Sequence, residues 1–130
     1  MKHLLAVYGT LKQGFGNNRL LQTSKLLGEQ NISGFKMYSL GGYPAINIAE
    51  DSDIKIEVYE INDPTVLNRV YSLEGYTGKR NDPSNWYDTT EVKTKWGAAE
   101  IFYFKDKLEN RPLVESGVWE KPVPQYGPRY

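Results

Sequence analysis

The chain has 130 residues with 16 basic and 16 acidic side chains, so its formal net charge at pH 7 is zero. This length suits a single domain over residues 1–130, and the balanced charge disfavours a nucleic-acid partner. The absence of cysteine excludes disulfides, thiolate metal sites and thiol nucleophiles. No segment reads as a signal peptide or a membrane span, so we expect a cytoplasmic protein that does not bind membranes.

The first third of the chain predicts strands around a short helix. Residues 3–8 predict a strand that is apolar on both faces, which is typical of a central strand. A short helix or helical turn is expected over residues 17–22. Residues 25–39 include two glycines and predict either two strands or one bent strand.

More strands are predicted on both sides of one longer helix. Residues 45–49 predict a short strand after a Gly-Gly-Tyr-Pro turn, and residues 55–61 alternate in polarity as a half-buried strand does. Residues 87–95 and 98–104 predict two strands joined by a turn. The segment after residue 105 contains several prolines and is expected to wrap the domain as an irregular, ordered tail.

The longer helix is predicted over residues 64–74 from the residues at its two ends. Asp63 is an N-cap residue, and Pro64 suits the first helical position. Gly75 is expected to end the helix in the left-handed C′ conformation.

The last residue of this helix, Glu74, is a carboxylate at an apolar position. At about 100° per residue it falls between Val70 and Leu67, in the middle of the apolar face. Burial and the negative end of the helix dipole both raise the pKa of a carboxyl, and no cation precedes Glu74 by three or four residues. A raised pKa suits a general acid/base near neutral pH, whereas fraying of the helix end into water is the structural alternative.

The glycine-rich loop after the first strand fails as a nucleotide-binding loop. Two of its glycines have Walker A spacing, but Phe15 and Gly16 stand where that motif needs Lys and Ser or Thr. A strand that ends at Gly9 would leave the amide N–H groups of Thr10 and Leu11 free. Such amides bind a carboxylate or an oxyanion.

The sequence contains few other candidate catalytic residues. His3 is the single histidine and no Gly-x-Ser-x-Gly motif accompanies it, so a structural histidine is expected. Without cysteine or clustered histidine we expect no metal and no cofactor. What remains is one acid/base carboxyl, backbone amides and tyrosine hydroxyls.

Short motifs in a fixed order extend over nearly the whole chain. They are Tyr8-Gly9-Thr10-Leu11, Asn18, Gly42-Tyr43-Pro44, Glu57-Val58-Tyr59, Leu73-Glu74-Gly75-Tyr76, Tyr87 and Glu115-Ser116-Gly117-Val118-Trp119. This ordered set resembles the γ-glutamylcyclotransferase-like, or AIG2-like, family, in particular its small bacterial members and the γ-glutamylamine cyclotransferases. The sequence departs from the family at Thr89, where many members have Arg, and at Ile56, where Gly is usual.

The resemblance implies an α+β fold, namely a small mixed barrel of six to seven strands with a few packed helices. It also implies an acyltransferase or lyase reaction, in which the α-amine of a γ-glutamyl amine or peptide attacks the side-chain carbonyl. The products are 5-oxoproline and a free amine. The family's general acid/base corresponds to Glu74, and the loop that holds the glutamyl group corresponds to Tyr8, Gly9, Thr10 and Leu11.

Several further expectations accompany this resemblance. Tyr43 and Tyr87 are expected to bind substrate, with Tyr59 and Tyr126 as additional pocket candidates. The expected partner is a small γ-glutamyl molecule, and the expected assembly is a monomer or a weak homodimer. Two other functions fit the same residues: a non-catalytic ligand-binding or regulatory protein that uses the same pocket, and removal of an amide or γ-glutamyl chain during biosynthesis.

Overall fold

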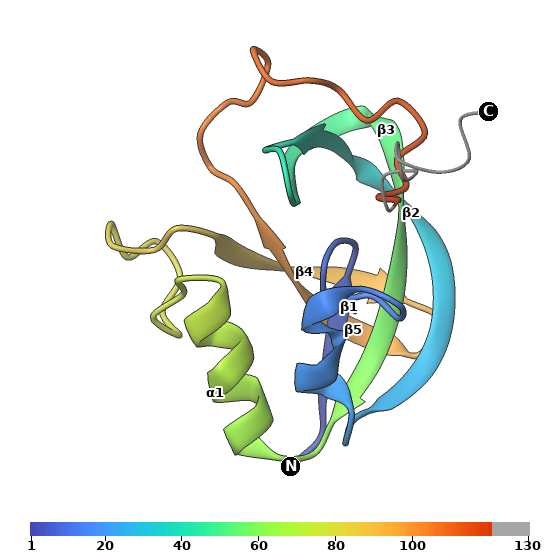
Figure 1. Ribbon diagram of the computed structural model, residues 1–130, viewed down its shortest axis with the longest axis vertical. Helices are drawn as coiled ribbons and strands as arrows, with labels where there is room; N and C mark the ends of the chain where they lie inside the picture. Colours follow the sequence, from blue (N-terminus) through green and yellow to red (C-terminus); the bar gives the residue numbers. More distant parts are fainter. Residues whose placement is uncertain (121–130) are drawn as a thin grey trace, which may run out of the picture.

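The computed structural model describes residues 1–120 as a mixed sheet with two helices (Figure 1). The helices are the 3-10 helix η1 (Gly16–Leu21) and the α-helix α1 (Pro64–Leu73). The strands are β1 (His3–Val7), β2 (Lys25–Ser39), β3 (Pro44–Ile61), β4 (Asp88–Thr94) and β5 (Gly97–Tyr103). The strand order is β2-β3-β1-β5-β4, in which β1 and β5 are parallel and the other neighbours are antiparallel. The α+β class is therefore as predicted.

The predicted barrel of six to seven strands is not formed. Within the described residues the sheet has five strands, and its hydrogen-bonded order ends at β2 and β4 without closing. The strand count differs because residues 25–39 form one strand and the segments 45–49 and 55–61 are joined in β3. Register shifts beside Gly28 and at Gly34 let β2 bend without breaking.

The central strand β1 buries side chains on both of its faces, as predicted. Leu5 and Val7 belong to a core cluster that includes Val70 of α1. Ala6 belongs to a second cluster, which includes Ile101 of β5. In Figure 1 the long β2–β3 pair curves around β1 and β5, and α1 lies at the other side of β1. The C-terminal end of β1 is thereby held close to the end of α1.

Helix α1 begins and ends through the predicted capping residues. The Asp63 carboxylate accepts a hydrogen bond from the amide of Thr65 at 2.9 Å. Gly75 follows the helix with φ +62°, the left-handed conformation that glycine adopts readily. The helix ends one residue earlier than predicted, so Glu74 is its C-cap, although the Glu74 amide still donates to the Val70 carbonyl at 3.0 Å.

The segment after β5 wraps over the β2–β3 pair, as expected for an ordered tail (Figure 1). The amide of Ser39 donates to the Pro112 carbonyl at 2.8 Å, and the amide of Lys55 donates to the Gly117 carbonyl at 2.9 Å. The rest of the predicted tail, with the pocket candidate Tyr126, lies outside the described residues.

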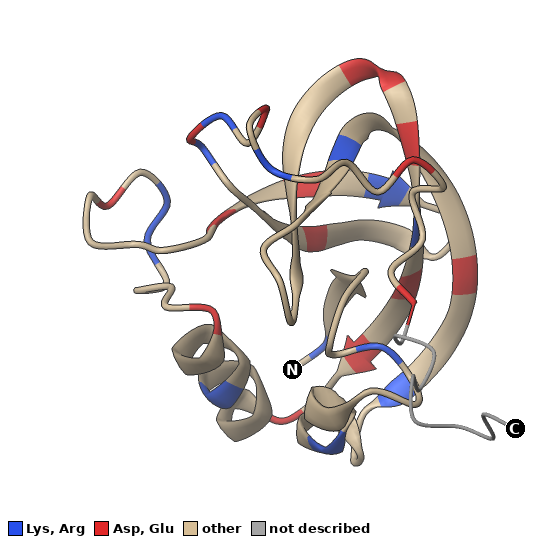
Figure 2. Ribbon diagram, turned by 45° about the horizontal axis from the view of Figure 1, so that its top comes forward, with Lys and Arg blue, Asp and Glu red and all other residues tan. Residues whose placement is uncertain are grey.

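Charged positions are distributed along the whole ribbon and do not gather on one face (Figure 2). This distribution agrees with the balanced composition of the sequence. None of the helices within residues 1–120 is both long enough and apolar enough to cross a membrane.

Candidate active site

A cavity of about 310 Å³ opens where the C-terminal ends of β1 and α1 meet. Its lining includes the predicted acid/base, loop and substrate-binding residues, namely Tyr8, Gly9, Thr10, Leu11, Tyr43, Glu74 and Tyr87. The fold therefore brings the loop after β1 and the end of α1 to one cavity. We call residues 8–11 the loop wall, and we call Leu73, Glu74, Trp86 and Tyr87 the helix-end wall.

Gly9 lets the loop wall approach the start of β3. A Cβ atom at this position would lie 2.7 Å from Cγ of Pro44, which is closer than real Cβ contacts allow. The neighbouring Tyr8 is buried, and its hydroxyl donates to the Phe102 carbonyl at 2.7 Å. The loop wall is thereby fixed against both β3 and β5.

Thr10 is held by Asn17 at the start of η1. The Asn17 amide N–H donates to the Thr10 carbonyl at 3.1 Å, and Nδ2 of Asn17 donates to Oγ1 of Thr10 at 2.9 Å. Within residues 1–120, the backbone N–H groups of Thr10 and Leu11 have no hydrogen-bond acceptor. These two amides match the predicted anion-binding groups, and both residues line the cavity.

A network of polar side chains supports the loop wall from outside the cavity. Oε1 of Glu57 accepts hydrogen bonds from the Gln13 amide at 2.8 Å and from the Tyr59 hydroxyl at 3.2 Å. Nδ2 of Asn18 donates to the Leu11 carbonyl at 2.8 Å and to the Tyr59 hydroxyl at 2.9 Å. Tyr59 is absent from the cavity lining, so this pocket candidate supports the loop instead.

Lys12 connects the loop to the C-terminal segment. Its side chain is buried, and its ammonium donates to the Trp119 carbonyl at 2.7 Å. Burial lowers the pKa of Lys12, while the negative charge of Glu57 acts in the opposite direction. Glu57 therefore supports the loop electrostatically as well as by accepting hydrogen bonds.

Glu74 in the helix-end wall is a half-buried carboxyl without a hydrogen-bond partner among the described residues. Loss of hydration raises its pKa from 4.5 to about 7, which is the direction predicted from the sequence. Its backbone is held firmly, because the Tyr87 amide donates to the Glu74 carbonyl at 3.2 Å. A carboxyl in this state can both accept and release a proton near neutral pH.

The two buried tyrosine hydroxyls beside Glu74 are already used as donors. The Tyr8 hydroxyl donates to the Phe102 carbonyl at 2.7 Å, and the Tyr87 hydroxyl donates to the Pro44 carbonyl at 2.8 Å. Burial raises the pKa of both tyrosines, and the Glu74 charge raises it further. Both hydroxyls therefore stay protonated and can only accept a hydrogen bond from a bound molecule.

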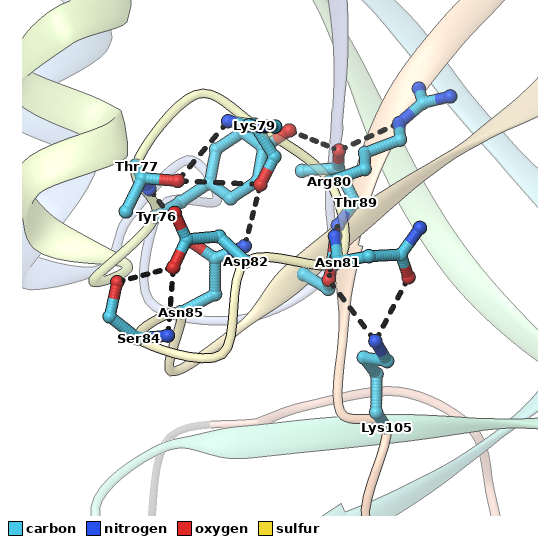
Figure 3. Close-up of polar contacts among 11 residues, drawn as sticks. Tyr76, Thr77, Lys79, Arg80, Asn81, Asp82, Ser84, Asn85, Thr89 and Lys105 are labelled. Atoms are coloured by element: carbon cyan, nitrogen blue, oxygen red, sulfur yellow. Dashed lines mark hydrogen bonds and ion pairs between the residues drawn. The ribbon is translucent and has the colours of Figure 1, made fainter.

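The polar segment between α1 and β4 is ordered by its own side chains (Figure 3). Oδ1 of Asn85 accepts from the Thr77 amide at 2.8 Å, and its Nδ2 donates to the Lys79 carbonyl at 2.9 Å. The Asp82 carboxylate accepts from both the amide and the hydroxyl of Ser84, at 2.9 and 2.7 Å. These bonds fix the segment that leads into Trp86 and Tyr87, both of which line the cavity.

Thr89 takes part in a buried contact and does not line the cavity. Its Oγ1 accepts a hydrogen bond from Nε of Arg80 at 3.1 Å and donates to the Tyr76 hydroxyl at 3.0 Å. Many family members have Arg at position 89, on β4. In this chain the guanidinium of Arg80, in the polar segment, lies beside Thr89 instead (Figure 3).

Sequence reasoning missed part of the cavity lining. Trp86 was not among the residues predicted for the site, yet it lines the cavity and is 51% exposed. The other lining residues that were not predicted are Ala6, Val7, Asn17, Gly42, Pro44, Leu73 and Phe102. The available signals were adjacency to Tyr87 for Trp86 and membership of the Gly42-Tyr43-Pro44 motif for Gly42 and Pro44. His3 contacts Glu100 at 3.0 Å, away from this cavity, as a structural histidine does.

Comparison with known proteins finds one family along most of the chain. Residues 5–121 match the model of the family described as gamma-glutamyl cyclotransferase, AIG2-like. A putative gamma-glutamylcyclotransferase from Vibrio cholerae is 32% identical over 120 residues, which cover 92% of this chain and 96% of that protein. A gamma-L-glutamyl-butirosin B gamma-glutamyl cyclotransferase from Niallia circulans is 32% identical over 82% of this chain and 71% of its own length.

The fold is shared with a solved structure. The crystal structure of an uncharacterized protein from Pyrococcus horikoshii superposes with a TM-score of 0.73 at 29% identity. The match covers 89% of this chain and 88% of that one.

Proposed function

The chain belongs to the AIG2-like gamma-glutamyl cyclotransferase family, and we propose that it converts a γ-glutamyl amine or γ-glutamyl peptide into 5-oxoproline and a free amine. One observation carries the proposal: Glu74, a half-buried carboxyl whose pKa is raised to about 7 by loss of hydration, lines the same cavity as the loop-wall amides. The Niallia circulans relative is named for removing a γ-glutamyl group from butirosin B, which supports the same bond cleavage here.

Glu74 transfers protons in this mechanism. Its carboxylate takes a proton from the α-ammonium of the substrate, and the freed amine attacks the γ-carbonyl carbon to close a five-membered ring. The resulting carboxylic acid returns the proton to the leaving nitrogen as the carbon–nitrogen bond breaks. Glu74 then takes the second proton from the ring nitrogen and passes it to the released amine, which leaves as an ammonium. Two protons have thus moved from the α-nitrogen to the leaving nitrogen, and the reaction consumes no water.

The loop wall holds the glutamyl group. The free amides of Thr10 and Leu11 bind the α-carboxylate or the oxyanion that develops on the γ-carbonyl. Because nucleophile and carbonyl belong to one molecule, holding that molecule folded removes much of the entropic barrier to ring closure. The roles of Gly9 and Tyr8 are then to shape and anchor this wall.

The test is a direct assay of 5-oxoproline. The purified chain is incubated with γ-glutamyl-n-butylamide and with γ-glutamylglycine, and the product is quantified by mass spectrometry. Glu74→Gln should lower kcat by about 10²- to 10⁴-fold, the usual contribution of a general acid/base. Glu91→Gln, at an exposed position on β4, is the matched control.

Two results would count against this mechanism. Full activity in Glu74→Gln would remove Glu74 from the chemistry. Tight retention of a γ-glutamyl ligand without turnover would instead favour a non-catalytic binding protein.

A further inference from the structure

Tyr71 and Glu100 form a polar contact beside the cavity that the proton transfers above do not use. The Tyr71 hydroxyl donates to Oε1 of Glu100 at 2.7 Å. Glu100 is buried on β5, Tyr71 is half-buried on α1, and neither residue lines the cavity. A short hydrogen bond from a hydroxyl to a carboxylate is a strong one, so the contact fixes the distance between α1 and β5.

Glu100 is held in its ionised form. Burial alone would raise its pKa, but hydrogen bonds from His3 and Tyr71 lower that pKa below the usual range of a glutamate. Nε2 of His3 lies 3.0 Å from the same Oε1 atom, so this oxygen connects β1 with α1. Two further charged side chains lie near the contact, namely Arg80 in the segment after α1 and Glu91, which pairs with Glu100 across β4 and β5. None of these charged groups lines the cavity.

Tyr71 also closes the turn that contains Glu74. The Tyr76 amide donates to the Tyr71 carbonyl at 2.9 Å, and the Gly75 amide donates to the Ser72 carbonyl at 3.2 Å. These two bonds are the Schellman arrangement, which makes the end of the helix one compact turn. Glu74 lies inside this turn, so a shift of Tyr71 moves the Glu74 carboxyl with it.

The ring of Tyr71 packs on the same face of β5 that carries Glu100. It meets the Phe102 ring edge-on with centroids 5.9 Å apart, and Phe102 lines the cavity. Glu100 and Phe102 are two residues apart on the strand and therefore share a face. The rings bury apolar surface, and the hydrogen bond to Glu100 adds the directional contact that fixes where the turn lies on the strand.

We propose that Tyr71 and Glu100 are positioning residues for the reaction, because their hydrogen bond ties the last turn of α1 to β5 and thereby holds the Glu74 carboxyl at the cavity. The inference rests on the proposed function, in which Glu74 transfers the protons. Since neither residue lines the cavity, both act through Glu74 and not on the substrate. Without the bond the helix end moves outward and water reaches Glu74.

The test is Tyr71→Phe, which keeps the ring and removes the hydroxyl. The Glu74 carboxyl is titrated by carbon-13 NMR in the native chain and in the variant, and Glu74→Gln assigns its signal. We expect the pKa of Glu74 to fall by about one pH unit, from about 7 toward 4.5, because the carboxyl regains hydration. The same pKa in both proteins would overturn the proposal. A merely destabilised fold would not change this pKa in the folded molecules.

Kinetics with γ-glutamyl-n-butylamide give the second readout. In Tyr71→Phe, kcat should fall about tenfold while KM stays near its native value, because the loop wall still holds the glutamyl group. The pH at which kcat/KM reaches half its plateau should fall together with the pKa of Glu74. No turnover by the native chain overturns the cyclotransferase function, whereas an active native chain with an unchanged variant overturns the positioning role alone.

Variants of Glu100 test whether the hydrogen bond itself is responsible. Glu100→Gln keeps an acceptor oxygen and should retain most of the native kcat, whereas Glu100→Ala should behave as Tyr71→Phe does. The double variant should show no larger shift than either single change, since both remove the same bond, and shifts that add would overturn the proposal. Tyr103→Phe is the matched control on β5, because the Tyr103 hydroxyl has no hydrogen bond within residues 1–120. It should leave the pKa of Glu74 unchanged.

Discussion

The two walls of the cavity present different kinds of group to a bound molecule. In the loop wall the Tyr8 and Thr10 hydroxyls have hydrogen-bond partners within the chain. The groups of this wall that are left to bind a ligand are the backbone amides of Thr10 and Leu11. In the helix-end wall the Glu74 carboxyl has no partner among the described residues, and the Trp86 ring is half exposed. In the proposed function the loop wall holds the ligand and the helix-end wall reacts with it.

The two walls also differ in how their polar groups affect the stability of the fold. Every wall residue with a satisfied polar group adds to the rigidity of the fold, whereas the half-buried Glu74 carboxyl, which has no partner within residues 1–120, opposes folding once it ionises. Replacing the Glu74 carboxylate should consequently stabilise the fold, whereas substitutions at wall or supporting residues with satisfied hydrogen bonds or close packing should destabilise it. Four substitutions test this contrast.

The largest effect on stability is expected for Glu74→Gln. Because folding raises the pKa of Glu74 from 4.5 to about 7, the native protein loses stability as pH rises through that window. Glutamine does not ionise, so the variant should be more stable than the native chain at pH 8, by up to about 3 kcal/mol. Urea unfolding at pH 8 and at about pH 4 measures this, and the difference should vanish at the lower pH. A variant that is less stable at pH 8 would contradict the contrast between the walls.

In the loop wall, Gly9→Ala should destabilise the protein. The added methyl group would collide with the Pro44 ring, and such overpacking costs about 1–3 kcal/mol. Thermal unfolding measures the loss, and ligand affinity should weaken with it because the wall moves. Gly16→Ala is the matched control, since its methyl group would meet nothing within 4 Å. Equal behaviour of the two variants would show that the contact with Pro44 is unimportant.

The support of the loop wall can be tested at Glu57. Glu57→Ala leaves the Gln13 amide and the Tyr59 hydroxyl without their acceptor, at a cost of about 1–3 kcal/mol. In the activity assay KM should rise more than kcat falls, because the chemistry resides in the other wall. Glu57→Gln keeps an acceptor oxygen and should recover most of the loss. A fall in kcat alone would assign Glu57 a different role.

The smallest effect is expected for Tyr87→Phe. The variant loses the hydrogen bond from the Tyr87 hydroxyl to the Pro44 carbonyl, which is worth about 1 kcal/mol. Tyr43→Phe serves as the control in the same unfolding experiment, since the Tyr43 hydroxyl has no hydrogen bond within residues 1–120. Equal stability of the two variants would mean that this bond adds nothing.

Local signals in the sequence account for what could be predicted. Asp63 and Gly75 set the ends of α1 through contacts with their immediate neighbours, so the position of Glu74 followed from helical geometry. The apolar run of β1 likewise predicted a strand covered on both faces. Once those two elements were placed, the ends that meet at the cavity could be named.

Pairing between distant segments accounts for what could not be predicted. The polar stretch around Asp51 and Asp53 separates the two strands predicted over residues 45–49 and 55–61, yet it lies within β3, where Asp53 pairs with Ser33 and Ile54 with Ile32. Neither its polarity nor its flanking residues reveal that partner. The exposure of Trp86 has the same origin, since it depends on how the segment before β4 meets Gly75. The expected barrel came from the family resemblance, and in residues 1–120 the strand pairing ends at β2 and β4 instead.

The most direct test of Glu74 as the acid/base is the pH dependence of kcat/KM for γ-glutamyl-n-butylamide. We predict that kcat/KM rises with pH and reaches half its plateau near pH 7, because the carboxyl must be ionised to accept the ammonium proton. The residual activity of Glu74→Gln should lack this step. A native profile that is flat between about pH 5 and 8, or the same step in Glu74→Gln, would contradict the assignment.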